Sequence, residues 1–120
     1  MRLAKERPTF SVVDDQWGQP TWTVDVVDMV ARLVEQQAPR GIYHATASGR
    51  TTWFEFAREA MATGGHDPQR IEAVGSDGYP TRADRPAFSV LGHATLERQG
   101  LQPIGDWRDR WKLAAERVLG

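Results

Sequence analysis

Hydrophobic and polar residues alternate along the chain in patterns that predict short strands separated by amphipathic helices. Residues 9–13 are mostly β-branched or aromatic and predict a strand, and turn-forming residues follow it over 14–20. A helix is predicted over 24–37, capped by Thr23 and ended by Pro39 and Gly41. Its apolar face is made by Val24, Val27, Val30, Ala31 and Val34. Residues 41–45 form the next expected strand, which is apolar on both faces, as in a strand buried between layers.

The second half of the chain continues this alternation. Thr52 and Glu55 have the spacing of a capping box and predict a helix that ends at Gly64 and Gly65. Its apolar side chains, which we expect in the core, are Trp53, Phe54, Ala57 and Met61. Residues 71–74 predict a strand, 76–87 a polar loop, and 92–99 and 105–119 two closing helices. One side of the last helix carries Trp107, Trp111, Ala114 or Ala115, and Val118, and we expect the two tryptophans to be core residues or interface anchors.

This order of elements predicts a single α/β domain over residues 1–120, with a few short strands and four to five helices. The predicted strands make only a thin sheet, so the buried character of 41–45 suggests that it joins a larger sheet supplied by other residues. Residues 1–7 are good helix formers without a cap in front of them. We therefore expect them to be the last turns of a longer helix.

Composition narrows the functions that the chain can have. Fifteen basic and sixteen acidic residues give a net charge of −1, so nucleic acid and anionic membranes are not expected partners. The chain has no cysteine, which excludes disulfides, thiolate metal sites and cysteine nucleophiles. No apolar run approaches the roughly 20 residues that cross a bilayer. The charged start has no secretory pattern, and we expect a cytoplasmic location.

Titratable residues do not form a catalytic pattern. His44, His66 and His93 lack the spacing of metal ligands, and we interpret His44 as a buried, hydrogen-bonded side chain. A hydrolase site at Ser48 is not supported, because no nucleophile elbow surrounds it. No Tyr-x-x-x-Lys occurs, since alanine stands four residues after both Tyr43 and Tyr79, and the glycines do not form a dinucleotide-binding loop.

Four segments together resemble the C-terminal portion of dTDP-4-dehydrorhamnose reductases, which belong to the extended short-chain dehydrogenase/reductase superfamily. They are V-V-D-D-Q-W-G-Q-P-T at 12–21, G-I-Y-H-A-T at 41–46 with Ser48 and Gly49, T-W-F-E-F-A at 52–57, and R-P-A-F-S-V-L at 85–91. They occur in the family's order and, with the closing W-R-D helix at 107–109, cover nearly the whole chain. Two positions depart from the pattern: Gly92 replaces a helix-capping aspartate, and Phe88 replaces a common tyrosine, whose hydroxyl is therefore absent.

The resemblance implies the C-terminal, substrate-binding part of a Rossmann-type reductase. Such enzymes reduce the 4-keto group of a dTDP-linked deoxysugar to give dTDP-L-rhamnose, with hydride from NADPH or NADH bound on an N-terminal half. The catalytic tyrosine and lysine also lie in that half, so we expect no catalytic or cofactor-binding residue here and no reductase activity from this chain alone. Some members dimerise, and Mg²⁺ assists in some cases; the residues of this chain give no separate indication of either.

The resemblance also suggests which residues hold the dTDP-sugar. Gln16, Gly18, Pro20 and Thr21 occupy the family's loop over the substrate cleft. Arg85 is the candidate for a diphosphate contact, because a guanidinium donates two parallel hydrogen bonds to phosphate. Trp17 and Trp22 are candidates for stacking on thymine or sugar. For each residue there is a simpler interpretation: a strand-to-helix turn for 16–21, a surface ion pair for Arg85, and packing for the tryptophans.

Two other functions remain open on the sequence. A chain without catalytic residues could be a regulatory or interaction module, as some members of the superfamily are. It could also be a truncated product with no independent function.

Overall fold

The computed structural model describes residues 2–78 and 83–120, without the side chains of residues 2 and 3. The chain is elongated, with extents of 50 × 33 × 21 Å and a radius of gyration of 16.5 Å. A compact domain of this length has a radius of gyration of about 13.5 Å. The accessible surface of 8176 Å² also exceeds the roughly 6,500 Å² expected for a compact protein of this mass. The polypeptide therefore leaves more surface open than a self-contained domain does.

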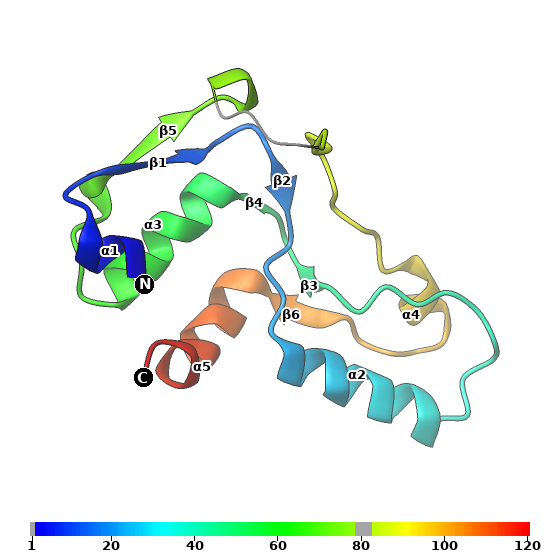
Figure 1. Cartoon of the computed structure of the whole chain (residues 1–120). Coiled ribbons are helices and arrows are strands. Elements are labelled where there is room, and N and C mark those ends of the chain that lie inside the picture. Colours follow the sequence, from blue (N-terminus) through cyan, green and yellow to red (C-terminus); the bar gives the residue numbers. More distant parts are fainter. Residues whose placement is uncertain (1, 79–82) are drawn as a thin grey trace.

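One part of the molecule is built around two parallel strands and a helix. Strand β1 (Phe10–Val13) pairs with β5 (Ile71–Val74) from Phe10↔Ile71 to Val13↔Val74. The elements around them are α1 (Arg2–Glu6), α3 (Trp53–Thr63) and the 3₁₀ turns Pro68–Arg70 and Ser76–Gly78. Figure 1 shows α1, α3 and the β1–β5 pair side by side. Ala4, Met61 and Ile71 are buried at the centre of this part.

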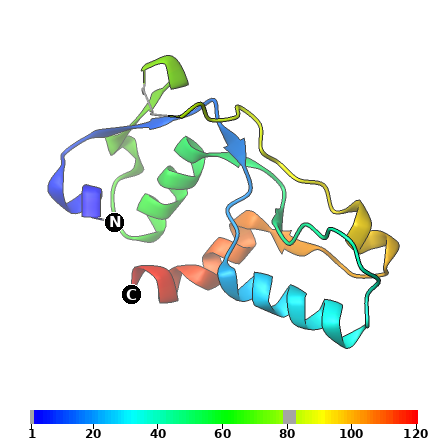
Figure 2. The ribbon, with the colours of Figure 1, turned by 45° about the vertical axis from the view of Figure 1, so that its right-hand side comes forward.

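A second group of elements surrounds a larger apolar cluster. It contains α2 (Thr23–Glu35), β3 (Ala47–Ser48), α4 (Ala94–Arg98), β6 (Ile104–Asp106) and α5 (Trp107–Leu119). Strands β3 and β6 are parallel. The buried residues of the cluster are Met29, Ala47, Leu96, Leu101, Ile104 and Trp107. Figure 2, a second view, shows the chain passing along α2 and returning through a long connection to β3.

The two groups are joined by a short ladder and by aromatic packing. Strand β2 (Trp17–Gly18) is antiparallel to β4 (Thr51–Thr52), directly before α3. The Phe56 ring meets Trp107 and Trp111 edge to face, with centroid distances of 6.0 and 5.2 Å. This ladder fixes the start of α3 against the segment that leads into α2, and the candidate site lies there.

Several predicted elements are confirmed. The strands at 9–13 and 71–74 and the helix that ends at Gly64 occur with nearly the predicted bounds. Thr52 Oγ1 accepts a hydrogen bond from Glu55 N (3.2 Å), as the capping box requires, while the Glu55 carboxylate accepts from Thr51 Oγ1 (3.0 Å). The two closing helices are present but begin later than predicted, at Ala94 and Trp107. The mixed α/β class is also confirmed.

The predicted strand at 41–45 is wrong for this chain. No strand occurs there in the described structure, and the Ile42 side chain is 79% exposed. A strand needs a hydrogen-bonded neighbour, and the described residues provide none at this segment. His44, expected to be buried, is half-buried, and its Nδ1 lies 3.0 Å from Gly92 O.

The apolar face predicted for 24–37 faces outward. Val27 is 66% and Val34 is 70% exposed, whereas Met29 on the other side is fully buried. Helix α2 begins at Thr23, so this residue is not its cap. The core assignment of Trp53 is also wrong, because its side chain is 58% exposed. Trp107 and Trp111 are core residues, whereas Val118, predicted on the same side of the last helix, is 57% exposed. The 14–20 turn also contains β2, which was not expected.

Candidate functional site

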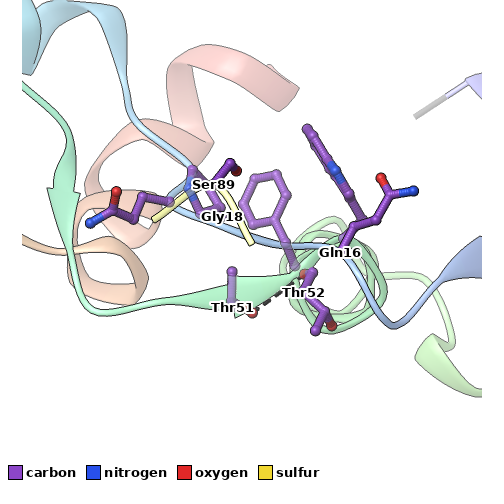
Figure 3. A pocket seen from close by; sticks show the side chains of 9 residues that line it. Gln16, Gly18, Thr51, Thr52 and Ser89 are labelled. Atoms are coloured by element: carbon purple, nitrogen blue, oxygen red, sulfur yellow. Dashed lines mark hydrogen bonds between the residues drawn. The ribbon is translucent and has the colours of Figure 1, made fainter. Parts of the chain in front are cut away.

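A pocket of about 190 Å³ opens where β2, β4 and the start of α3 meet the 88–91 segment. Figure 3 shows Gln16 on one side, Gly18 and Ser89 on another, and Thr51 and Thr52 at its base. The remaining lining residues are Gln19, Pro20, Trp53 and Phe56. The pocket therefore combines residues from three segments of the chain that are far apart in sequence.

Backbone hydrogen bonds attach the 87–91 segment to β2. Trp17 N donates to Ala87 O (2.8 Å), and Ser89 N donates to Trp17 O (3.0 Å). The Gln19 side chain makes two hydrogen bonds with the backbone of Leu91: Nε2 donates to Leu91 O (3.1 Å), and Oε1 accepts from Leu91 N (2.8 Å). These bonds hold one wall of the pocket in place and bring together two of the four segments on which the resemblance rests.

The opposite wall is fixed through the end of β1. Gln16 Nε2 donates to Ser76 Oγ (2.9 Å). Asp15 accepts from Ser76 N (2.8 Å) and from Ser76 Oγ (2.7 Å). These two donors lower the pKa of the Asp15 carboxyl below its ordinary value. The parallel pairing of β1 with β5 brings residues 15–16 and 76 together, since their carboxyl ends lie at the same edge.

The structure places the predicted sugar-binding residues differently from one another. Gln16, Gly18 and Pro20 line the pocket. Thr21 lies outside its lining; its hydroxyl donates to Gln19 O (2.8 Å) and accepts from Ala47 N (3.0 Å), so it fastens the turn to β3. Arg85 is exposed and is also outside the lining.

The two tryptophans proposed as stacking residues each have an arginine over the ring. The guanidinium carbon of Arg50 lies 5.4 Å from the Trp17 centroid, and that of Arg117 lies 5.6 Å from the Trp22 centroid. Trp22 lines a second cavity of about 200 Å³, whose other lining residues are Pro20, Thr21, Phe56, Trp107, Arg110, Trp111, Ala114 and Val118. A ligand that stacked on the face of Trp17 or Trp22 covered by the arginine would displace a cation–π contact.

Sequence reasoning missed part of the pocket. Thr51, Trp53 and Ser89 line it, although all three lie within or beside the motifs. Trp53 was assigned to the core because it has helical spacing with Ala57 and Met61. The first residue of a helix often lies at the edge of the side that faces the core, and this position was the signal in the sequence that Trp53 could be exposed.

The pocket is uncharged within the part of the chain that the structure describes, since no lining residue is acidic or basic. Over residues 2–78 and 83–120 no group of three histidine or acidic side chains could hold a metal ion. Among the described helices, none has the length and apolar character needed to cross a membrane.

Comparison with known proteins agrees with these features. The family described as "RmlD substrate binding domain" matches residues 1–119. A dTDP-4-keto-6-deoxy-D-glucose reductase of Streptomyces niveus is 44% identical over 107 residues, 89% of this chain and 37% of the relative. A dTDP-4-dehydrorhamnose reductase of Streptomyces griseus is 43% identical over 112 residues, 90% of this chain and 37% of the relative.

Solved structures of similar proteins have the same fold. A dTDP-4-dehydrorhamnose reductase ortholog from Clostridium acetobutylicum superposes with a TM-score of 0.92 at 28% identity, covering 99% of this chain and 42% of its own. The dTDP-4-dehydrorhamnose reductase of Bacillus anthracis, solved in complex with NADP, gives a TM-score of 0.87 at 30% identity, covering 93% and 39%. The chain thus spans about 37% of the length of the curated relatives named above. With a family match over residues 1–119, the chain belongs to the RmlD substrate binding domain family.

Proposed function

We propose that this chain binds the nucleotide-sugar of a dTDP-4-dehydrorhamnose reductase, within a larger protein that carries out NAD(P)H-dependent reduction to dTDP-L-rhamnose. The observation that carries this proposal is the pocket between β2, β4 and α3, which brings together Gln16, Gly18 and Pro20 of the motif at 12–21. The family match and the names of the relatives support the same substrate class.

The exposed apolar surface supports a covering body in the whole protein. Val27, Val34 and Ile42 are each more than half exposed. Val27 and Val34 lie two turns apart on one face of α2, and an exposed apolar helix face is typical of an interface. We assign this surface to contact with the nucleotide-binding part of the parent protein, which would supply the neighbour that residues 41–45 need to pair as a strand.

The cofactor does not fit the residues of this chain. The pocket of about 190 Å³ lies below the roughly 300–1,000 Å³ of sites for drug-sized ligands, and a dinucleotide is larger still. No lining residue within the described part of the chain offers a cation to a diphosphate. No step of the reaction is therefore assigned here, and NADPH or NADH belongs to the other part of the proposed enzyme.

Roles for individual residues follow within the proposal. The Gln16 amide bonds a sugar hydroxyl, and Gly18 leaves the backbone open beside it. Pro20 and Thr21 hold the turn, with Thr21 acting through its hydrogen bonds rather than by contact with the ligand. Arg85 contacts the diphosphate outside the pocket.

A chimera tests the proposal. The segment of the Streptomyces griseus reductase that aligns with this chain is replaced by residues 1–120, and NADPH oxidation with the dTDP-4-keto sugar is measured. We expect turnover by the chimera and none by the 120-residue chain alone. Gln16→Ala should lower kcat/KM about 5- to 10-fold through one lost hydrogen bond, whereas Gln102→Ala, at an exposed glutamine outside the pocket, should not change it. A folded but inactive chimera, or turnover by the isolated chain, would contradict the proposal.

A further inference from the structure

Two of the hydroxyl groups that line the pocket, those of Thr51 and Ser89, have already used their donors. Thr51 Oγ1 donates to the Glu55 carboxylate (3.0 Å), and Ser89 Oγ donates to Trp17 O (3.0 Å). A hydroxyl has one donor and two acceptor lone pairs. Thr51 is 1% exposed, so of these two oxygens only Ser89 Oγ faces a ligand, and it offers lone pairs alone. A ligand group that contacts Ser89 Oγ must bring an O–H or N–H donor.

The same arrangement is unsuitable for phosphate. A diphosphate is an acceptor of hydrogen bonds and needs cationic or N–H donors. The described lining contains no lysine or arginine, and the exposed hydroxyl oxygen of Ser89 presents lone pairs. The diphosphate of a nucleotide-sugar therefore lies outside this pocket, and a neutral, hydroxyl-rich group fits inside.

Besides hydrogen-bond acceptors, the pocket has a flat apolar surface, which is the side chain of Trp53. It is the first residue of α3, lines the pocket, and is 58% exposed. Trp107 and Trp111 are 3% and 8% exposed, so Trp53 is not part of the aromatic core. An indole ring left in water beside acceptor oxygens can cover the C–H face of a sugar while the oxygens bind its hydroxyls.

The geometry points to this pocket as the subsite for the sugar ring alone, with Trp53 as its stacking surface and the exposed Ser89 as an acceptor for a sugar hydroxyl. The inference rests on the proposed function and deepens it. It replaces Trp17 and Trp22 with Trp53 as the stacking residue. It also separates the sugar, held here, from the diphosphate and base, held elsewhere.

Saturation-transfer NMR on the 120-residue chain tests this, because the method detects weak binding and resolves which ligand protons touch the protein. The probes are dTDP-L-rhamnose and dTDP. We expect strong transfer to the sugar methyl and ring protons, weak transfer to thymine, and tighter binding of dTDP-L-rhamnose than of dTDP. Trp53→Ala should abolish transfer to the sugar and reduce the advantage of dTDP-L-rhamnose about 5- to 10-fold, while Trp53→Phe keeps part of both.

Trp22→Phe is the matched control, since Trp22 lines the other cavity, and should leave the sugar signals unchanged. Because Trp53 is largely exposed, its replacement removes little packing, and circular dichroism verifies that each variant is folded. Unchanged sugar signals in Trp53→Ala, or dominant thymine signals in the wild type, would overturn the sugar subsite while leaving nucleotide binding intact. Absence of any transfer from either probe would overturn the proposed function as well.

Discussion

Breaking the ion pair between Asp25 and Arg110 should destabilise the chain strongly, and the loss of stability should depend on which of the two residues is replaced. Arg110 Nε donates to Asp25 Oδ2 (2.9 Å), and Nη2 donates to Oδ1. This pair connects the first turn of α2 to α5. The Asp25 side chain is 4% exposed, whereas that of Arg110 is 29% exposed. The hydrogen bonds that Arg110 donates to Asp25 raise the pKa of Arg110, so the guanidinium stays charged wherever the protein folds.

The exposures determine the expected magnitudes. Arg110→Ala leaves a largely buried carboxylate without its cation, which costs about 3–5 kcal/mol. Asp25→Ala leaves a guanidinium that can partly rehydrate, so its cost should be smaller, about 2–3 kcal/mol. At roughly 4 °C per kcal/mol for a domain of this size, Arg110→Ala should lower Tm by about 12–20 °C.

Urea and thermal unfolding, followed by circular dichroism and tryptophan fluorescence, measure these values. The exposed pair Lys112–Asp109 is the control: its atoms are 3.4 Å apart, but its side chains are 63% and 75% exposed. Lys112→Ala should change stability by no more than about 0.5 kcal/mol. If Arg110→Ala cost less than about 1 kcal/mol, or less than Asp25→Ala, the reasoning from burial would be refuted.

Three other substitutions test separate features. Hydrogen bonds from Ser76 lower the pKa of Asp15, so the contribution of Asp15 to stability is present above the pKa of the unfolded chain and is lost as pH falls through the lower pKa of the folded chain. In Ser76→Ala, an NMR titration should show the pKa of Asp15 returning toward its ordinary value, and an unchanged pKa would contradict the assignment. Gly49→Ala should lower the free energy of unfolding by about 1–3 kcal/mol, because φ of Gly49 is +76° and a Cβ would overlap Asp106 and lie 3.2 Å from Trp107. Gly65→Ala, where φ is +72° but no atom lies near the new Cβ, should lower it by only about 1 kcal/mol, and equal losses in stability would show that the contacts at Gly49 are unimportant. Val27→Asp should leave the stability of this chain within about 0.5 kcal/mol but reduce turnover by the chimera, and an active Val27→Asp chimera would show that α2 is not an interface.

Local signals explain the parts of the fold that could be predicted. The β-branched and aromatic residues at 9–13, the short apolar run at 71–74, and the helix between the cap Thr52 and the stop Gly64 identify β1, β5 and α3, because each element depends mainly on its own residues. The order of four motifs also identified the family. The pocket was predicted in part: the 12–21 motif supplied Gln16, Gly18 and Pro20.

The remaining features depend on contacts between distant segments. β2 and β4 are two residues long, which is too short to produce a periodic pattern, so their pairing was invisible before folding. That pairing and the backbone bonds from Trp17 to residues 87 and 89 bring Ser89 to the pocket.

The amino-acid sequence by itself determined which residues can form helices and strands, where they begin and stop, and to which family the chain belongs. Only the tertiary structure decided which apolar side chains are covered. In the sequence, Val27 and Val34 of α2 look as apolar as Met29, and Trp53 looks as apolar as Trp107. In the structure, however, the two valines and Trp53 are exposed, whereas Met29 and Trp107 are buried. Hydrophobicity is a property of one residue, but burial requires a second surface, and its position is set by packing between elements.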